Sequence, residues 1–222
     1  MEIRLPDARA ALIMLVTPAL MIGLSVWAWG SWSEFIAHPA RLGACVVVAL
    51  SSFAALFSGA NLRGLDHADR RTRWIIPLAI VVTLAMAWAP AYADRRGLAT
   101  VDGDMIRYIG LALFVVGCVL RVGPVFALGT RFRAPWLKQE EHRLVTTGFY
   151  RFIRHPSYLG VLLAMPGWFL VFRCGIGIVL GLLLIPATVF WLPREEAMLL
   201  EEFGEDYAAY TRRTWRLVPF IY

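Results

Sequence analysis

Residues 142–160 read HRLVTTGFYRFIRHPSYLG, and the rest of the chain can be understood outward from this stretch. It holds two of the four histidines and three arginines, and it ends where an uncharged apolar run begins. Pro156, at the start of that run, is typical of the first position of a helix, where its missing N–H costs nothing. With Arg154 and His155 beside it, the start of this helix would suit an anionic group.

The composition predicts an integral membrane protein. Of the 222 residues, 59% are hydrophobic and only 17% are charged, whereas about 25% of the residues of a soluble domain are charged. Several uncharged runs reach about 20 residues, the length at which a helix crosses the hydrocarbon core of a bilayer. Most of the basic residues fall in the connecting loops, where they set orientation, so the net charge of +6 does not indicate a nucleic-acid partner.

The chain is predicted to be all-α and polytopic, with a single membrane domain over residues 1–222. Four spanning helices are expected within residues 1–128, at 10–32, 42–62, 74–93 and 106–128. A long cytoplasmic loop follows at 129–158, then a transmembrane helical hairpin at 159–193 and a tail at 194–222 that begins with a cytoplasmic amphipathic helix. Residues 33–41 are expected to form only a short turn between the first two spans.

The distribution of basic residues predicts the orientation. The N-terminus, the 63–73 loop, the 129–157 loop and the tail together hold 16 of the 22 Lys and Arg residues and lie on one side of the predicted membrane. Because basic loops stay in the cytoplasm, both termini are expected there, and the His142–Gly160 stretch faces the cytoplasm. The predicted location is the inner (cytoplasmic) membrane of a bacterium.

Arg121 falls well inside an expected span, several residues from either end. An intramembrane charge is costly, so it is a candidate functional residue, here for contact with a substrate. The alternative is that its side chain extends from near the end of the span to the headgroups. No pair of cysteines or histidines has metal-ligand spacing, so no metal site is expected.

The tail helix is expected to end near Arg213 and to carry its apolar side chains on one stripe. The stripe consists of Leu199, Leu200, Phe203, Tyr207 and Tyr210, and Glu196 lies on it, whereas Glu195 points more toward water. A carboxylate on an apolar face needs a partner. Because the 159–193 hairpin brings its two ends together, Arg154 and His155 should face Glu196. Such a site would suit a zwitterionic soluble cofactor that meets an apolar substrate.

The segment LVTTGFYRFIRHPSYLG, the hydrophobic hairpin and the segment REEAMLLEEFGEDYAAYTRRTWRLVP together resemble the isoprenylcysteine carboxyl methyltransferase family, which belongs to a group with phospholipid and thiol methyltransferases. The resemblance covers roughly residues 128–219. It implies S-adenosyl-L-methionine as cofactor and a membrane lipid or a lipidated molecule as acceptor. The cofactor contacts that it implies are His142, Arg143, Leu144, Val145, Tyr150, His155, Pro156, Ser157, Tyr158, Gly160, Glu195 and Glu196.

Catalytic roles are expected for Glu196, Tyr158 and Arg154, and substrate contacts for Arg194 and Arg121. Carboxyl-methylating members of the family resemble each other in an arginine about one turn before the glutamate pair. Here that turn reads Phe190-Trp191-Leu192-Pro193, and Arg194 is the cation nearby. The acceptor is therefore left open among a prenylcysteine carboxylate, a phospholipid amine and a small thiol. A non-catalytic membrane protein that reuses the fold is the further alternative.

Overall fold

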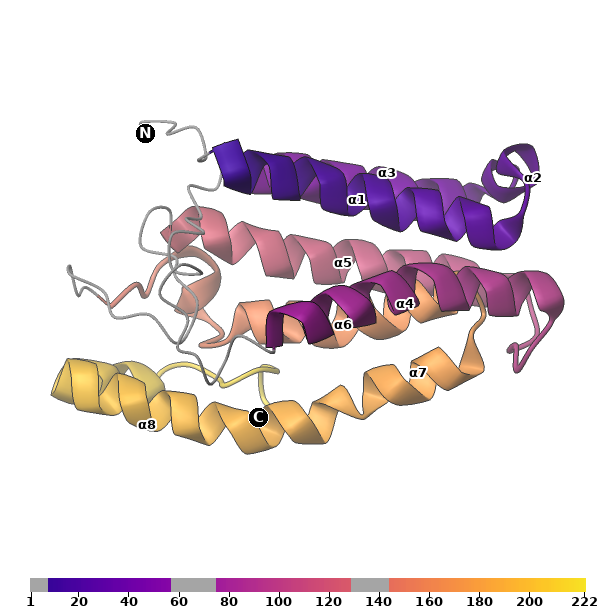
Figure 1. Ribbon diagram of the computed structural model, residues 1–222. Helices are drawn as coiled ribbons and strands as arrows, with labels where there is room; N and C mark the ends of the chain where they lie inside the picture. The colour runs from indigo at the N-terminus through magenta and orange to yellow at the C-terminus, as the bar shows by residue number, and fades with distance from the viewer. Residues whose placement is uncertain (1–7, 57–74, 129–143) are drawn as a thin grey trace.

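The computed structural model describes residues 8–56, 75–128 and 144–222, and these are helical apart from turns, loops and two isolated β-bridges. Figure 1 shows long helices that run side by side along one axis, as predicted for an all-α membrane protein. The helices are α1 (Ala8–Trp29), α2 (Trp32–Ile36), α3 (Pro39–Leu56), α4 (Ile75–Arg96), α5 (Met105–Leu128), the 3₁₀ helix η3 (Gly148–Arg151), α6 (Pro156–Val171), α7 (Gly175–Leu182) and α8 (Leu184–Thr211).

Three stretches of the described helices are long and apolar enough to cross a membrane: residues 39–56, 105–124 and 175–211. Shorter apolar helices cover 15–29 and 156–171. Large apolar side chains point outward along these elements, for example Leu50 on α3, Val119 on α5 and Leu180 on α7. Such surface would be unfavourable in water but is matched by lipid. The chain is therefore an integral membrane protein.

Helices α5 and α6 approach each other with almost no side-chain spacer. A Cβ atom added at Gly160 would lie 2.6 Å from the backbone nitrogen of Arg121, and one at Gly167 would lie 2.6 Å from that of Phe114. Gly110 and Gly117 on α5 are equally crowded by the α6 backbone. Each helix thus has two glycines seven residues apart, which lets the two backbones come into contact, as small residues do between membrane helices.

The end of the bundle at α2 is held by a buried ion cluster around Asp94, whose side chain is fully buried. Arg107 forms a two-pronged pair with it at 2.5 and 3.0 Å, and Arg173 donates from Nε at 3.0 Å. Arg107 also pairs with exposed Asp104, whose pKa lies below its usual value chiefly because His38 hydrogen-bonds to it at 2.9 Å. The cluster joins the ends of α4, α5 and the α6–α7 turn.

The predicted spans correspond to α1, α3, α4 and α5, and the predicted hairpin to α6 followed by α7 and α8. Two details differ from the sequence prediction. The short helix α2 begins at Trp32, one residue before the predicted turn, and occupies residues 33–36 of it; it is capped by Ser31, whose Oγ accepts from the backbone N–H of Glu34 at 3.4 Å. The second leg is interrupted at Leu183 and then continues into the tail as α8 without a break at Pro193; its kink lies at Gly204 (φ 55°). The predicted end of the second span, residues 57–62, and the start of the third, residue 74, lie outside the described residues.

Gly167→Ala should lower the midpoint of thermal unfolding in detergent by roughly 2–10 °C, because forcing a methyl group into this interface costs about 1–3 kcal/mol. Gly23→Ala on α1 is the matched control, since a Cβ there meets no atom within 4 Å. Circular dichroism during heating measures both variants. Equal midpoints for Gly167→Ala and wild type would show that close contact between α5 and α6 is not required.

Candidate active site

The site is built where α6 begins, and the C-terminal tail forms one of its walls. His155 is the residue before α6 and Pro156 occupies its first turn, as the sequence predicts. The backbone N–H groups of Arg154 and His155 donate to the carbonyls of Trp215 and Arg216 at 2.8 and 3.1 Å. The N–H of Trp215 in turn donates to Phe152 at 3.0 Å. This short parallel pairing fixes the chain that leads into α6 against the end of the tail.

Glu196 lies at the centre of this junction and is only 9% exposed. Arg154 donates from Nε to its Oε1 at 2.8 Å, and His155 Nε2 lies 3.3 Å from the same oxygen. Arg216 holds the other oxygen, Oε2, from Nε at 2.9 Å and from a terminal nitrogen at 2.6 Å. The predicted approach of Arg154 and His155 to Glu196 is thus present as direct contact. We call these four residues the Glu196 cluster.

The cations of the cluster are also bound to the backbone and side chains of the tail. Arg154 Nη1 donates to the carbonyls of Thr211, at 3.2 Å, and Thr214. Arg216 Nη1 contacts the hydroxyl of Tyr222 at 2.7 Å, and its hydrogen bonds to Glu196 raise its pKa above the usual value. Arg216 therefore stays charged. All four residues of the cluster have partners within the chain.

Two further polar pairs lie on the first turn of α6, next to the cluster. The hydroxyl of Tyr158 donates to Glu195 Oε2 at 2.6 Å, so Glu195 is partly buried instead of pointing to water. On the neighbouring helix, Arg121 donates from Nη1 to the hydroxyl of Ser157 at 2.5 Å. Within the described residues, no acidic partner of Arg121 is found. A carboxylate and a guanidinium thus each contact the first turn of α6.

Two tyrosines of α8 complete the surroundings. Tyr210 donates from its hydroxyl to the carbonyl of Tyr150 at 2.7 Å, which ties α8 to η3. Tyr207 is only 2% exposed, and its hydroxyl has no hydrogen-bond partner among the described residues. The predicted inward stripe of α8 is confirmed at Glu196, Tyr207 and Tyr210, whereas Leu200 is 48% exposed and was wrongly assigned to it.

The other predicted site residues divide into three groups. His142 and Arg143 lie outside the described residues. Leu144, Val145 and Tyr150 are partly buried in the chain that precedes α6. Gly160 is enclosed by the α5 backbone, and Arg194 is exposed, with its guanidinium 4.4 Å from the centre of the Phe190 ring and outside the cluster.

Sequence reasoning missed the role of Arg216. It follows the predicted tail helix by three residues, and nothing in the spacing shows that the chain turns back there toward Arg154. One signal was available in the sequence. A carboxylate on an apolar helix face can bind more than one cation, so other arginines of the tail could have been considered as partners of Glu196.

A sequence model of the family described as "Phospholipid methyltransferase" matches residues 105–206. Protein-S-isoprenylcysteine O-methyltransferase of Tribolium castaneum is 36% identical over 124 residues, which cover 51% of this chain and 41% of that protein. Protein-S-isoprenylcysteine O-methyltransferase B of Arabidopsis thaliana is 32% identical over 124 residues, 52% of this chain and 60% of that protein. The chain therefore spans only about two fifths to three fifths of these relatives.

The fold is shared more widely than the sequence. A solved structure of the eukaryotic intramembrane Ras methyltransferase, isoprenylcysteine carboxyl methyltransferase, superposes with a TM-score of 0.60 at 22% identity. The superposition covers 96% of this chain and 77% of that one. The structural similarity thus also includes the helices α1 to α4, which precede the part of the chain that matches the family model.

Glu196→Gln should lower the stability of the protein by up to about 3–5 kcal/mol, because it leaves the partly buried Arg154 and Arg216 without their anion. Glu195→Gln, the same change one residue earlier, should unfold close to the wild-type temperature, since an amide can still accept from Tyr158. Thermal unfolding in detergent, followed by circular dichroism, compares the two. A Glu196→Gln variant as stable as Glu195→Gln would contradict a structural role for the cluster.

Proposed function

We propose that the chain, whose sequence is similar to protein-S-isoprenylcysteine O-methyltransferases and to the phospholipid methyltransferase family model, is an S-adenosyl-L-methionine-dependent methyltransferase. It acts at the cytoplasmic face of the membrane on a lipophilic acceptor, for which an isoprenylcysteine-type carboxylate is the first candidate. The observation that carries the proposal is the pair of contacts Tyr158–Glu195 and Arg121–Ser157, which present opposite charges at the start of α6. Both pairs lie within the part of the chain that matches the family model.

The polar groups around α6 fit such a cofactor chemically. S-adenosylmethionine has an ammonium group and ribose hydroxyls that need acceptors, and a carboxylate that needs donors. Glu195 supplies an acceptor, and the Tyr207 hydroxyl is a buried group with an unused hydrogen bond. Donors for the carboxylate would be backbone N–H groups in the first turn of α6, after Pro156, and, as the family resemblance implies, the side chains of His142 and Arg143. Leu144, Val145 and Tyr150 would enclose the adenosine from the same loop.

We assign different tasks to the two neighbouring glutamates. Both oxygens of Glu196 are held by cations of the protein, so Glu196, Arg154 and His155 are positioning residues that fix α6, α8 and the tail relative to one another. Glu195 and Tyr158 are the groups left to contact bound molecules. When bound, S-adenosylmethionine supplies a methyl group on a sulfonium that is its own leaving group. The chain then has to align the acceptor and keep water out.

Arg121 is the residue that we propose for the acceptor. It lies on α5, which crosses the membrane, and reaches Ser157 at the start of α6. A cation at this depth can hold an anionic group of an acceptor whose apolar part stays in lipid. It would replace the arginine that carboxyl-methylating relatives carry before the glutamate pair. A carboxylate held there needs no general base, because it is already deprotonated at neutral pH.

A phospholipid amine is the second candidate acceptor, because the matching family model is described as phospholipid methyltransferase. An amine must lose a proton before or during transfer. Glu195, with Tyr158 beside it, is the base that the site offers. The phosphate group of such a lipid would then bind the guanidinium of Arg121. The two candidates thus use the same cation but differ in whether Glu195 is needed for chemistry.

Purified protein in detergent should transfer labelled methyl groups from S-adenosylmethionine to a prenylated cysteine derivative. The same assay with phosphatidylethanolamine in mixed micelles and with a small thiol identifies the acceptor class. Label in the phosphatidylethanolamine alone would select the amine. Label in the thiol alone would exclude a lipophilic acceptor. No label in any acceptor, from protein that is folded and binds the cofactor, would contradict methyl transfer to these classes.

Arg121→Met should raise the KM for the anionic acceptor by about 10- to 100-fold, the worth of one hydrogen bond to a charged group. The affinity for S-adenosylmethionine should stay unchanged. Arg194→Met is the matched variant, since Arg194 was the other arginine predicted to contact substrate and it lies outside the cluster. A larger effect at Arg194 than at Arg121, measured with labelled cofactor at varied acceptor concentration, would reverse the assignment.

A further inference from the structure

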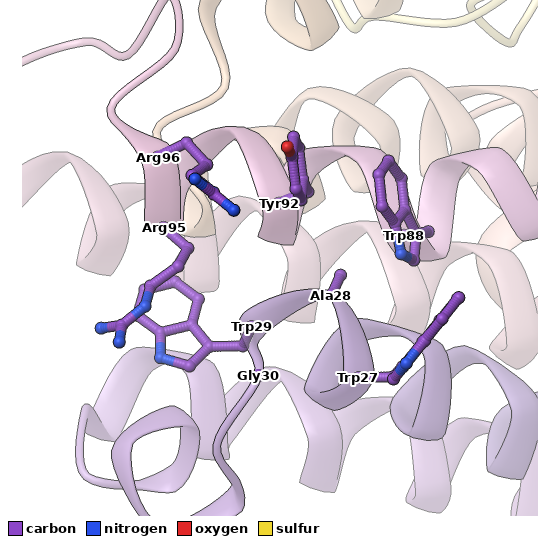
Figure 2. A pocket seen from close by; sticks show the side chains of 8 residues that line it. All are labelled: Trp27, Ala28, Trp29, Gly30, Trp88, Tyr92, Arg95 and Arg96. Atoms are coloured by element: carbon purple, nitrogen blue, oxygen red, sulfur yellow. The ribbon is translucent and has the colours of Figure 1, made fainter.

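We propose that the protein has a second binding site, for an anionic phospholipid, in the cavity between the ends of α1 and α4. This cavity has a volume of about 580 Å³ and lies near the Asp94 cluster, at the end of the bundle away from the Glu196 cluster. Its walls come from two segments, Trp27–Gly30 at the end of α1 and residues 88–96 of α4 (Figure 2). The proposal does not depend on methyl transfer.

The cavity has one aromatic wall that is already ordered. The rings of Trp88 and Tyr92 stack with centroids 4.5 Å apart and an interplanar angle of 15°. From the opposite helix, the ring of Trp27 lies 6.4 Å from that of Trp88 and is 71% exposed (Figure 2). Ala28, Trp29 and Gly30 complete the lining on the side of α1.

The α4 wall changes from apolar to cationic along its length. Trp88, Tyr92 and Arg96 are spaced four residues apart and so lie in one row on the helix. The row extends about 12 Å, at 1.5 Å per residue. The guanidinium of Arg96 lies 5.4 Å from the centre of the Tyr92 ring, at the end nearest the terminus of α4. This gradient matches a phospholipid, whose phosphate would lie by the arginine and whose upper acyl chain would lie by the tryptophans.

The charge at the cavity favours an anion. Arg95 and Arg96 both line it, and Arg95 pairs with Glu34 at 2.6 Å. Among the described residues, Arg96 has no acidic partner. The nearby carboxylate of Asp94 pairs with Arg107 and Arg173 inside the bundle. One positive charge is therefore uncompensated at the mouth of the cavity. Two adjacent arginines offer enough donors to bind a phosphate group.

The position in the membrane selects a lipid as the occupant. Tryptophan and tyrosine gather where membrane helices meet the headgroups, and Trp27, Trp88 and Tyr92 all lie near the ends of α1 and α4. The two helices are fixed just below the cavity, where buried Ser25 donates to the carbonyl of Ala87 at 2.7 Å. A site that is rigid, aromatic and cationic at headgroup level is matched by a phospholipid with a net negative charge.

Binding can be measured by native mass spectrometry of the full-length protein released from an uncharged detergent. Dihexanoyl phosphatidylglycerol is the anionic probe, dihexanoyl phosphatidylcholine the zwitterionic one, and glycerol phosphate the headgroup without chains. We expect the anionic lipid to bind at least fivefold more tightly than either of the others. Equal binding of the two lipids would overturn the role of charge, and equal binding of glycerol phosphate would show a site for soluble phosphate instead of lipid.

The variants assign that binding to the cavity. Arg95→Gln with Arg96→Gln should weaken binding of the anionic lipid by about tenfold or more, as expected for losing two cations near a phosphate. Arg213→Gln is the matched control, because Arg213 is an exposed arginine of the tail, and it should bind as wild type does. Trp27→Leu tests the aromatic wall without changing charge. Wild-type affinity in both the double variant and Trp27→Leu, with circular dichroism unchanged, would overturn the proposal.

Discussion

The contact between the backbones of α5 and α6 determines where the polar groups of the protein can lie. Glycines on both helices remove the spacer that side chains would provide, and at Gly160 the α6 backbone touches α5 at Arg121. The arginine is thereby held at the start of α6, where its guanidinium reaches Ser157. In lipid, a cation needs such a polar neighbour. Helix packing and the placement of the Arg121 charge thus have a common cause.

A second constraint is electrostatic. Removing the carboxylate of Glu196 from water is costly, and the cost is offset because two arginines and a histidine from two parts of the chain surround it. The arrangement closes the C-terminal tail against the start of α6. It also leaves the two adjacent glutamates in different settings, since arginines bind both oxygens of Glu196 whereas Glu195 accepts a hydrogen bond from Tyr158. A site can then bind a charged ligand without losing its own framework.

Much of this architecture could be predicted from the sequence. The apolar runs predicted the membrane spans. The predicted hairpin, whose two ends must lie close together, predicted that Arg154 and His155 lie near Glu196. Contacts that depend on the third dimension could not be predicted in this way. Arg216 reaches Glu196 only because the tail folds back, and Gly160 touches α5 only because of the helix crossing. The α8 helix continues through Pro193 because a proline removes one hydrogen bond but does not have to end a helix.

We propose that the groups at the start of α6 bind S-adenosylmethionine. Isothermal titration calorimetry of the folded, detergent-purified protein tests this most directly, with the demethylated product as a second ligand. We expect micromolar binding of both compounds to wild type and markedly weaker binding to Glu195→Gln, whose fold should be intact. Absence of heat with either compound, from protein shown by circular dichroism to be folded, would contradict the claim and favour a non-catalytic protein that shares this fold.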